Sequence, residues 1–275
     1  MKDRTKIVKI YTENNDFQHA EVLKRNRVKR LQNKKFFVEG VKSINLAIEN
    51  NWNIDSFLYS SEKKLSNWAQ NILDKSIAKK HIEMTNNLMV KLSDKEDTSE
   101  LIALIEMKSD NLDRIAIKND LLIVVIDRAS SPGNLGTILR SCNSFNVDAV
   151  IMTGHSVDLY DPKTIQASVG TIFSIPVIRL ESQNELLTWI KKIKSKIADF
   201  TIIGTTVKTD TNVDTENIKK PLMLLIGNKT LGLSSKYKEI CDKLVKIPIS
   251  GSASSLNVAC ATSICLYEIN RKNRQ

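Results

Sequence analysis

Three polar segments in the second half of the chain carry the residues best suited to chemistry. The first, residues 131–145 (SPGNLGTILRSCNSF), sets Asn134, Gly136 and Arg140 within about two helical turns of a Pro-Gly break. An asparagine can cap a helix, and a glycine allows close backbone approach. The segment lacks the G-x-G-x-x-G and G-K-[ST] spacings of nucleotide-binding loops. Taken alone, an ordinary turn into a helix with a surface arginine is the more frequent structure.

The second and third segments are rich in glycine and serine and follow apolar stretches. In 224–237 (LLIGNKTLGLSSKY), Gly227 ends an apolar run, so a glycine-limited turn can offer backbone amides and carbonyls to a ligand. In 245–269, an Ile-Pro pair ends a strand, a small-residue loop follows, and a helix begins near Asn257. Each segment alone also fits a plain connecting loop.

An alternation of strands and helices must position these segments. The strands are continuous apolar runs, as expected of parallel strands covered on both faces. They are predicted at 121–127, 148–154, 174–180, 200–206, 221–227 and 243–249. Helices are predicted between them, at 134–146, 161–170, 183–198, 235–242 and 255–271. The last helix is apolar nearly all round, so we expect it to be largely buried.

The first half predicts a smaller α/β unit. Its strands are expected at 36–40, 54–60, 81–84 and 100–107, and its helices at 41–51 and 62–77. The polar segment 108–120 is predicted as a linker, which divides the chain into domains at 1–107 and 121–275.

The formal net charge is +10, which favours an anionic partner such as nucleic acid, although a lysine-rich genome gives the same balance. The distribution is more informative, because KRNRVKRLQNKK holds seven cations and no acid. We predict a helix with a phosphate-facing surface, the alternative being a solvated helical face. Its candidate RNA-binding residues are Lys24, Arg25, Arg27, Lys29, Arg30, Lys34 and Lys35.

Other site classes find little support. The four cysteines form no C-x-x-C pair and the three histidines lie apart from them, so we expect neither a metal site nor disulfides. No apolar run approaches the roughly 20 residues that span a bilayer, and no apolar core follows the first charges as in a secretory signal. The expectation is a cytoplasmic protein without a membrane partner.

Together the three segments resemble the motifs of the SpoU–TrmH family of RNA 2′-O-ribose methyltransferases, in the SPOUT superfamily. N-x-G-x-x-x-R, G-N-x-x-x-G-L-S and I-P-x-x-G-x-x-x-S-L-N-V occur in the family's order, each after a predicted strand. The stretch KKFFVEGVKSINLAIE is similar, more loosely, to the family's small RNA-recognition domain.

The resemblance implies an α/β chain with an N-terminal RNA-recognition domain and a C-terminal SPOUT domain, whose parallel sheet contains a trefoil knot. It also implies S-adenosyl-L-methionine as cofactor, a homodimer, and RNA as substrate, with rRNA favoured over tRNA. By position it assigns cofactor binding to Thr205, Gly227, Asn228, Ile247 and Leu256.

The same resemblance assigns catalytic positions to Asn134, Arg140, Ser255 and Asn257. The reaction it implies is attack of a ribose 2′-hydroxyl on the cofactor's methyl group, and the family assigns proton removal to the arginine that matches Arg140. Arginine stays protonated in proteins. We therefore expect Arg140 to orient an RNA phosphate and to stabilise developing alkoxide charge.

Two positions depart from the family pattern. Lys229 stands where glutamate is usual, and Gln166 stands where relatives often carry arginine. The alternative reading is therefore a catalytically impaired RNA-binding or ribosome-assembly protein with the same fold. A nucleotide-binding dehydrogenase is a poor third reading, because the glycine fingerprint is missing.

Overall fold

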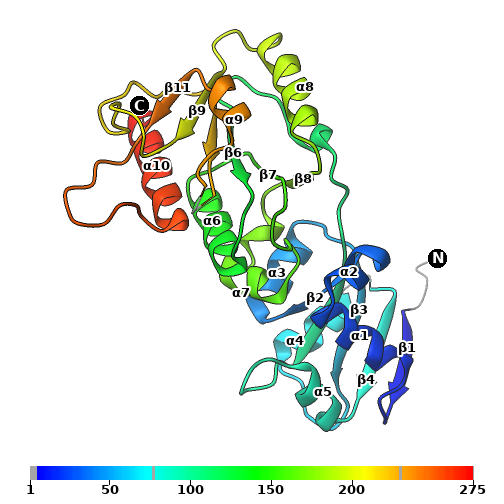
Figure 1. The fold of residues 1–275 in the computed structure, drawn as a ribbon. Coiled ribbons are helices and arrows are strands. Elements are labelled where there is room, and N and C mark those ends of the chain that lie inside the picture. Colours follow the sequence, from blue (N-terminus) through cyan, green and yellow to red (C-terminus); the bar gives the residue numbers. More distant parts are fainter. Residues whose placement is uncertain (1–4, 76–77, 229–230, 275) are drawn as a thin grey trace. The chain divides into compact units, whose positions relative to one another are not determined.

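The chain forms two compact units (Figure 1). The computed structural model describes three stretches, residues 5–75, 78–228 and 231–274. The N-terminal unit consists of residues 1–108 and 158–174, and the rest of the chain forms the C-terminal unit. The apolar pattern predicted one domain from residue 121 onward, whereas the segment 158–174 groups with the N-terminal residues.

Among its described residues, the N-terminal unit forms a mixed sheet in the order β1-β4-β3-β5-β2. β1, β4 and β3 are parallel, and β5 runs antiparallel to both β3 and β2. The strands are β1 Lys6–Ile10, β2 Lys35–Glu39, β3 Ile54–Ser60, β4 Lys80–Met84 and β5 Leu101–Glu106. The helices are α1 Asn15–Arg25, α2 Arg27–Asn33, α3 Val41–Glu49, α4 Asn67–Lys75 and α5 Asn86–Leu92. β1 and α5 were not predicted from the sequence.

The basic segment spans the last two residues of α1 and the whole of α2, rather than the single helix that was predicted. Asn26 lies between them in extended conformation, with φ −118° and ψ 110°. Its side chain accepts a hydrogen bond from the backbone N–H of Lys29, which caps α2. An asparagine that bonds its neighbouring backbone competes with helix continuation, which explains the break.

The segment 158–174 contains α7 (Pro162–Ser168) and the 3₁₀ helix η2 (Thr171–Phe173). Aromatic contacts tie it to the N-terminal unit, because the Phe36 and Tyr160 rings stack with centroids 4.3 Å apart. The Trp52 indole N–H donates to the Phe173 carbonyl at 3.0 Å. Gly170, at φ +83°, lies so close to α3 that a Cβ there would be 3.0 Å from the Ser43 Cα.

The C-terminal unit contains a parallel sheet whose described strands follow the order β11-β9-β10-β6-β7-β8. The strands are β6 Leu122–Asp127, β7 Ala149–Thr153, β8 Val177–Leu180, β9 Thr201–Thr205, β10 Leu222–Ile226 and β11 Lys243–Val245. The helices are η1 Leu112–Arg114, α6 Pro132–Ser144, α8 Gln183–Lys194, α9 Ser235–Ile240 and α10 Val258–Lys272. β6, β7 and β10 are buried along their whole length, which confirms the expectation for parallel strands covered on both faces.

Two details of this unit differ from the sequence expectations. In the segment predicted as a linker, Leu112 and Ile115 are buried in the core of the C-terminal unit. The prediction that the last helix is largely buried was wrong, because α10 buries one face while Ile264 and Tyr267 are 37% and 49% exposed. No helix in the described part of the chain is both long and apolar enough to cross a membrane.

Candidate functional site

A cavity of about 320 Å³ opens at the carboxyl ends of β9, β10 and β11, where ligands of parallel α/β sheets commonly bind. Every residue predicted to bind the cofactor lines it, namely Thr205, Gly227, Asn228, Ile247 and Leu256. Ser255, predicted as catalytic, lines it as well. The segments that follow β9, β10 and β11 therefore meet in one place because these strands end at one edge of the sheet.

Several lining residues were not singled out from the sequence. They include the apolar side chains of Ile226, Val245, Val258 and Leu231, and the cations Lys208, Lys238 and Lys246. Ile226 and Val258 could have been found, because Ile226 lies at the end of a predicted strand and Val258 in the first turn of a predicted helix. Nothing in the sequence distinguishes these three lysines from the many others.

Gly227 is the position where the cavity wall tolerates no side chain. A Cβ on Gly227 would lie 2.3 Å from the Gly232 carbonyl carbon and 2.3 Å from the Leu233 nitrogen. The turn is closed by a short antiparallel bridge, in which the Asn228 and Gly232 backbones exchange hydrogen bonds of 3.2 and 2.9 Å. The wall of the cavity here is therefore backbone, with its amides and carbonyls close to the ligand space.

The first and third motifs meet through two asparagines. Asn257 caps α10: its Oδ1 accepts from the Ala259 N–H at 2.8 Å, and its Nδ2 donates to Asn134 Oδ1 at 3.1 Å. Asn134 was expected to cap α6, but Ser131 is the cap residue and Asn134 follows in the first turn. These bonds fix both amides, and Asn134 Nδ2 donates to no residue in the described stretches, so it is free to meet a ligand.

Arg140 lies apart from this cavity wall. It is exposed on α6, and its guanidinium makes no hydrogen bond or ion pair with any residue that the structure describes. α6 is held beside α10 by a 2.7 Å contact between the hydroxyls of Ser141 and Ser263. An exposed arginine with no partner among the described residues is available to bind an anion, but the structure does not bring Arg140 to the cavity.

The cavity offers no activated thiol or metal cluster. Cys265 lines it, and burial raises the pKa of that thiol to about 12. A thiol with such a pKa stays protonated and weakly nucleophilic near neutral pH. The described residues include no group of three or more histidine, cysteine or acidic side chains that could hold a metal.

Comparison with known families matches both parts of the chain. The SpoU rRNA methylase family matches residues 121–267, and the SpoU L30e-like domain matches residues 14–103. The chain belongs to the SpoU rRNA methylase family. The matched regions include all three motifs as well as the basic segment, which confirms the family resemblance seen in the sequence.

Individual SpoU relatives match most of this chain or somewhat more than half of it. The 23S rRNA (uridine(2479)-2′-O)-methyltransferase of Streptomyces viridochromogenes is 38% identical over 265 residues, covering 96% of this chain and 92% of that protein. The SpoU methyltransferase AviRb of the same organism, solved in complex with the cofactor AdoMet, is 39% identical with a TM-score of 0.89, covering 94% of this chain and 98% of that one. The 23S rRNA (guanosine-2′-O-)-methyltransferase RlmB of Coxiella burnetii is 32% identical over 170 residues, covering 59% of this chain and 66% of that protein.

The basic segment of this SpoU protein presents fewer free cations than its sequence suggests. Arg30 is 2% exposed, and its guanidinium bonds Asp158 at 2.7 Å and the Leu23 and Lys24 carbonyls. Lys24 is 8% exposed and pairs with Asp94. The phosphate-facing prediction therefore has to be corrected for Arg30 and Lys24, because their charges are compensated inside the N-terminal unit.

The remaining predicted RNA-binding residues are more accessible. Arg25 pairs with Glu21 on the surface and Lys35 pairs with Asp55, whereas Lys29 and Lys34 are exposed without an ion pair among the described residues. Arg27 is exposed as well. These five residues stay candidates for RNA contact.

Of the two residues that depart from the SpoU pattern, Lys229 and Gln166, the structure describes only Gln166. Lys229 lies outside the described residues. Gln166 is exposed on α7, within the segment that packs with the N-terminal unit.

Proposed function

We propose that this chain is an S-adenosyl-L-methionine-dependent RNA ribose 2′-O-methyltransferase, with rRNA favoured over tRNA as substrate. The observation that carries the proposal is the meeting of all three SpoU motifs, two at the cavity and one at its Asn134–Asn257 edge. Relatives named as 23S rRNA methyltransferases support rRNA as substrate. No observation favours the alternative of an RNA-binding relative without turnover.

The cavity fits the cofactor in size and lining. A volume of about 320 Å³ lies within the usual range of small-molecule sites. Apolar side chains suit an adenine ring, while the backbone around Gly227 offers hydrogen-bonding groups. We assign cofactor binding to Thr205, Gly227, Asn228, Ile247 and Leu256. When bound, the cofactor supplies a methyl group activated by a positively charged sulfur.

The chain's own polar groups would then act on the RNA. Asn134 lies at the edge of the cavity, and its side-chain N–H groups donate to no described residue. They can therefore orient a ribose hydroxyl. Asn257 positions that amide, and Ser255 offers a hydroxyl on the cavity wall. Arg140 carries a permanent charge and suits a phosphate next to the reacting ribose, where it stabilises developing negative charge.

An assay of methyl transfer with radiolabelled cofactor on rRNA and on tRNA tests the proposal. We expect incorporation into rRNA and a loss of about 10²-fold or more in Arg140→Ala, as for removal of one charge-stabilising donor. Arg271→Ala is the matched control, because Arg271 is an exposed arginine in the same unit. Absence of incorporation into either RNA, with cofactor binding intact, would overturn the proposed activity.

We also propose a homodimer in the cytoplasm, where rRNA is modified, and the trefoil knot in the C-terminal unit. The exposed face of α10 supports a second copy, because Ile264 and Tyr267 leave apolar surface uncovered and Tyr267 packs edge-on against Phe145. Light scattering at micromolar concentration should give twice the chain mass, and Tyr267→Lys should shift the protein toward the monomer. A monomer at all concentrations would refute the dimer.

A further inference from the structure

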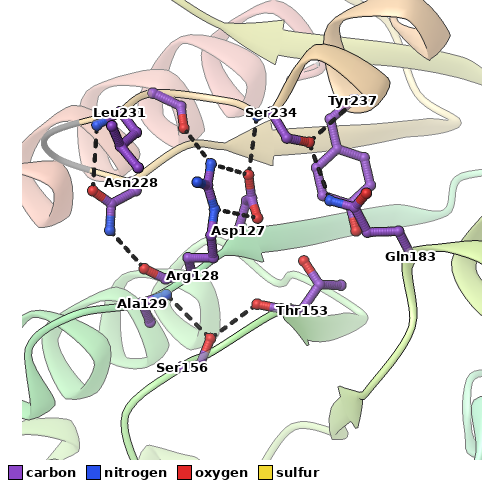
Figure 2. A network of polar contacts seen from close by, with 11 residues as sticks. Asp127, Arg128, Ala129, Thr153, Ser156, Gln183, Asn228, Leu231, Ser234 and Tyr237 are labelled. Atoms are coloured by element: carbon purple, nitrogen blue, oxygen red, sulfur yellow. Dashed lines mark hydrogen bonds and ion pairs between the residues drawn. The ribbon is translucent and has the colours of Figure 1, made fainter.

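A buried ion pair between two neighbouring residues lies at the end of β6 (Figure 2). Asp127 is 1% exposed, and its Oδ1 and Oδ2 accept hydrogen bonds from Nε and Nη2 of Arg128 at 3.1 and 2.8 Å. Side chains of successive strand residues normally point to opposite faces of the sheet. A bidentate pair between neighbours therefore needs an unusual backbone.

Arg128 has that backbone. Its φ is +56°, a left-handed conformation that non-glycine residues seldom adopt and that strains the backbone. Gly154, at the end of β7, makes room for the folded-back side chain, since a Cβ there would lie 2.7 Å from Arg128 Cγ. The strained turn and the glycine opposite it both serve to place one guanidinium.

Arg128 holds the start of the cofactor-binding turn through its backbone carbonyl, and the ion pair holds the end of the turn. At the start of the turn, Asn228 Nδ2 donates to the Arg128 carbonyl at 2.8 Å. At its end, Arg128 Nη2 donates to the Gly232 carbonyl at 3.0 Å, and the Ser234 N–H donates to Asp127 Oδ2 at 3.1 Å. Figure 2 shows these bonds converging on the Asp127–Arg128 pair from the loop above it.

We propose that Asp127 and Arg128 are positioning residues that preset the cofactor-binding turn. The inference rests on the proposed function. Asn228 and Gly232 line the cavity, whereas Asp127 and Arg128 do not, so the pair acts through the turn rather than by touching the ligand. A turn held in its bound shape loses little freedom on binding, and such preorganisation raises affinity. The strain at Arg128 persists because the surrounding hydrogen bonds determine its conformation.

The test compares Asp127→Asn with Asp110→Asn by calorimetric titration of S-adenosyl-L-methionine. Asp110 forms the matching bidentate pair with Arg179 in the same unit, but neither residue lines the cavity. We expect Asp127→Asn to weaken binding about tenfold or more, the effect of losing roughly one net hydrogen bond to a charged group. Asp110→Asn should leave the cofactor affinity unchanged, even if it lowers the melting temperature as much as Asp127→Asn does.

Arg128→Gly is the second variant, because glycine removes the left-handed strain, although the buried Asp127 carboxylate then loses its ion pair. We expect it to melt below the parent and, at a temperature where its melting curve shows it folded, to bind cofactor about tenfold more weakly. Parent-like affinity in both Asp127→Asn and Arg128→Gly would overturn the inference. Failure of the parent itself to bind the cofactor would instead overturn the proposed function.

Discussion

Replacing Gly227 by alanine should disrupt the cavity that we propose binds the cofactor. The added Cβ would lie 2.3 Å from two backbone atoms, the Gly232 carbon and the Leu233 nitrogen. Ordinary contacts between carbon atoms are about 3.5–4.0 Å. The backbone opposite must therefore retreat by more than an ångström, and no side-chain rotation can relieve the overlap.

The size of the effect follows from the hydrogen bonds that such a shift breaks. Asn228 and Gly232 exchange two backbone bonds, and the Gly232 carbonyl accepts a third from Arg128. At about 1 kcal/mol each, their loss totals about 3 kcal/mol. If the cofactor must restore the turn, its affinity should fall by roughly 10²-fold.

Calorimetric titration of S-adenosyl-L-methionine, with thermal melting as the check on folding, measures this loss. Gly251→Ala is the control: although Gly251 belongs to the third motif, it does not line the cavity, and a Cβ there meets no atom within 4 Å. We expect Gly251→Ala to bind like the parent. Parent-like cofactor affinity in Gly227→Ala would refute the reasoning, because the backbone opposite would then have moved without weakening cofactor binding.

Three further predictions concern stability and reactivity. Arg30→Ala leaves a buried carboxylate unpaired and should lower the free energy of unfolding by about 3–5 kcal/mol in urea titrations, against less than about 1 for the surface variant Arg25→Ala. Burial raises the pKa of the Cys142 thiol, so at pH 8 a thiol reagent should label exposed Cys260 and spare Cys142 until the protein unfolds, as peptide mass spectrometry would show. Burial also raises the pKa of Tyr237 to about 12, above the value near 10 of an unfolded tyrosine. The stability it contributes is therefore present below pH 10 and lost between pH 10 and 12, and urea titrations of Tyr237→Phe should show a shallower decline there.

The C-terminal sheet and the cavity residues were predictable because their signals are local. Most of the parallel strands are short apolar runs, and a parallel sheet brings the ends of such runs to one edge. Gly227 and Ile247 follow two of these ends, so the rule that placed the strands also placed the cavity. Boundaries were less certain: the strand predicted at 243–249 ends at Val245, and α10 begins at Val258 rather than at 255.

The charges of the basic segment could not be predicted, because their partners are distant in the sequence. Arg30 pairs with Asp158, which is 128 residues away and lies in a segment predicted to belong to the other domain. A run of cations indicates a phosphate-facing surface only if no acidic side chain of the folded protein pairs with those cations. Lys24 and Arg30 are buried away from that surface, whereas Lys29 and Lys34 are exposed on it. Substitution of Lys29 or Lys34 should therefore change the salt dependence of RNA binding.

Asp127 and Arg128 were overlooked for a different reason. In the sequence they are the last residue of a strand and an arginine after it, and nothing marks the arginine as left-handed. Its conformation is explained only by Gly154, which follows β7, and by Gly232, which lies in the loop after β10. The motifs of the family name the groups that meet the ligand. The groups that hold those motifs in shape can be identified only from how the chain packs. Here the structural signal that locates them is backbone strain at a non-glycine residue.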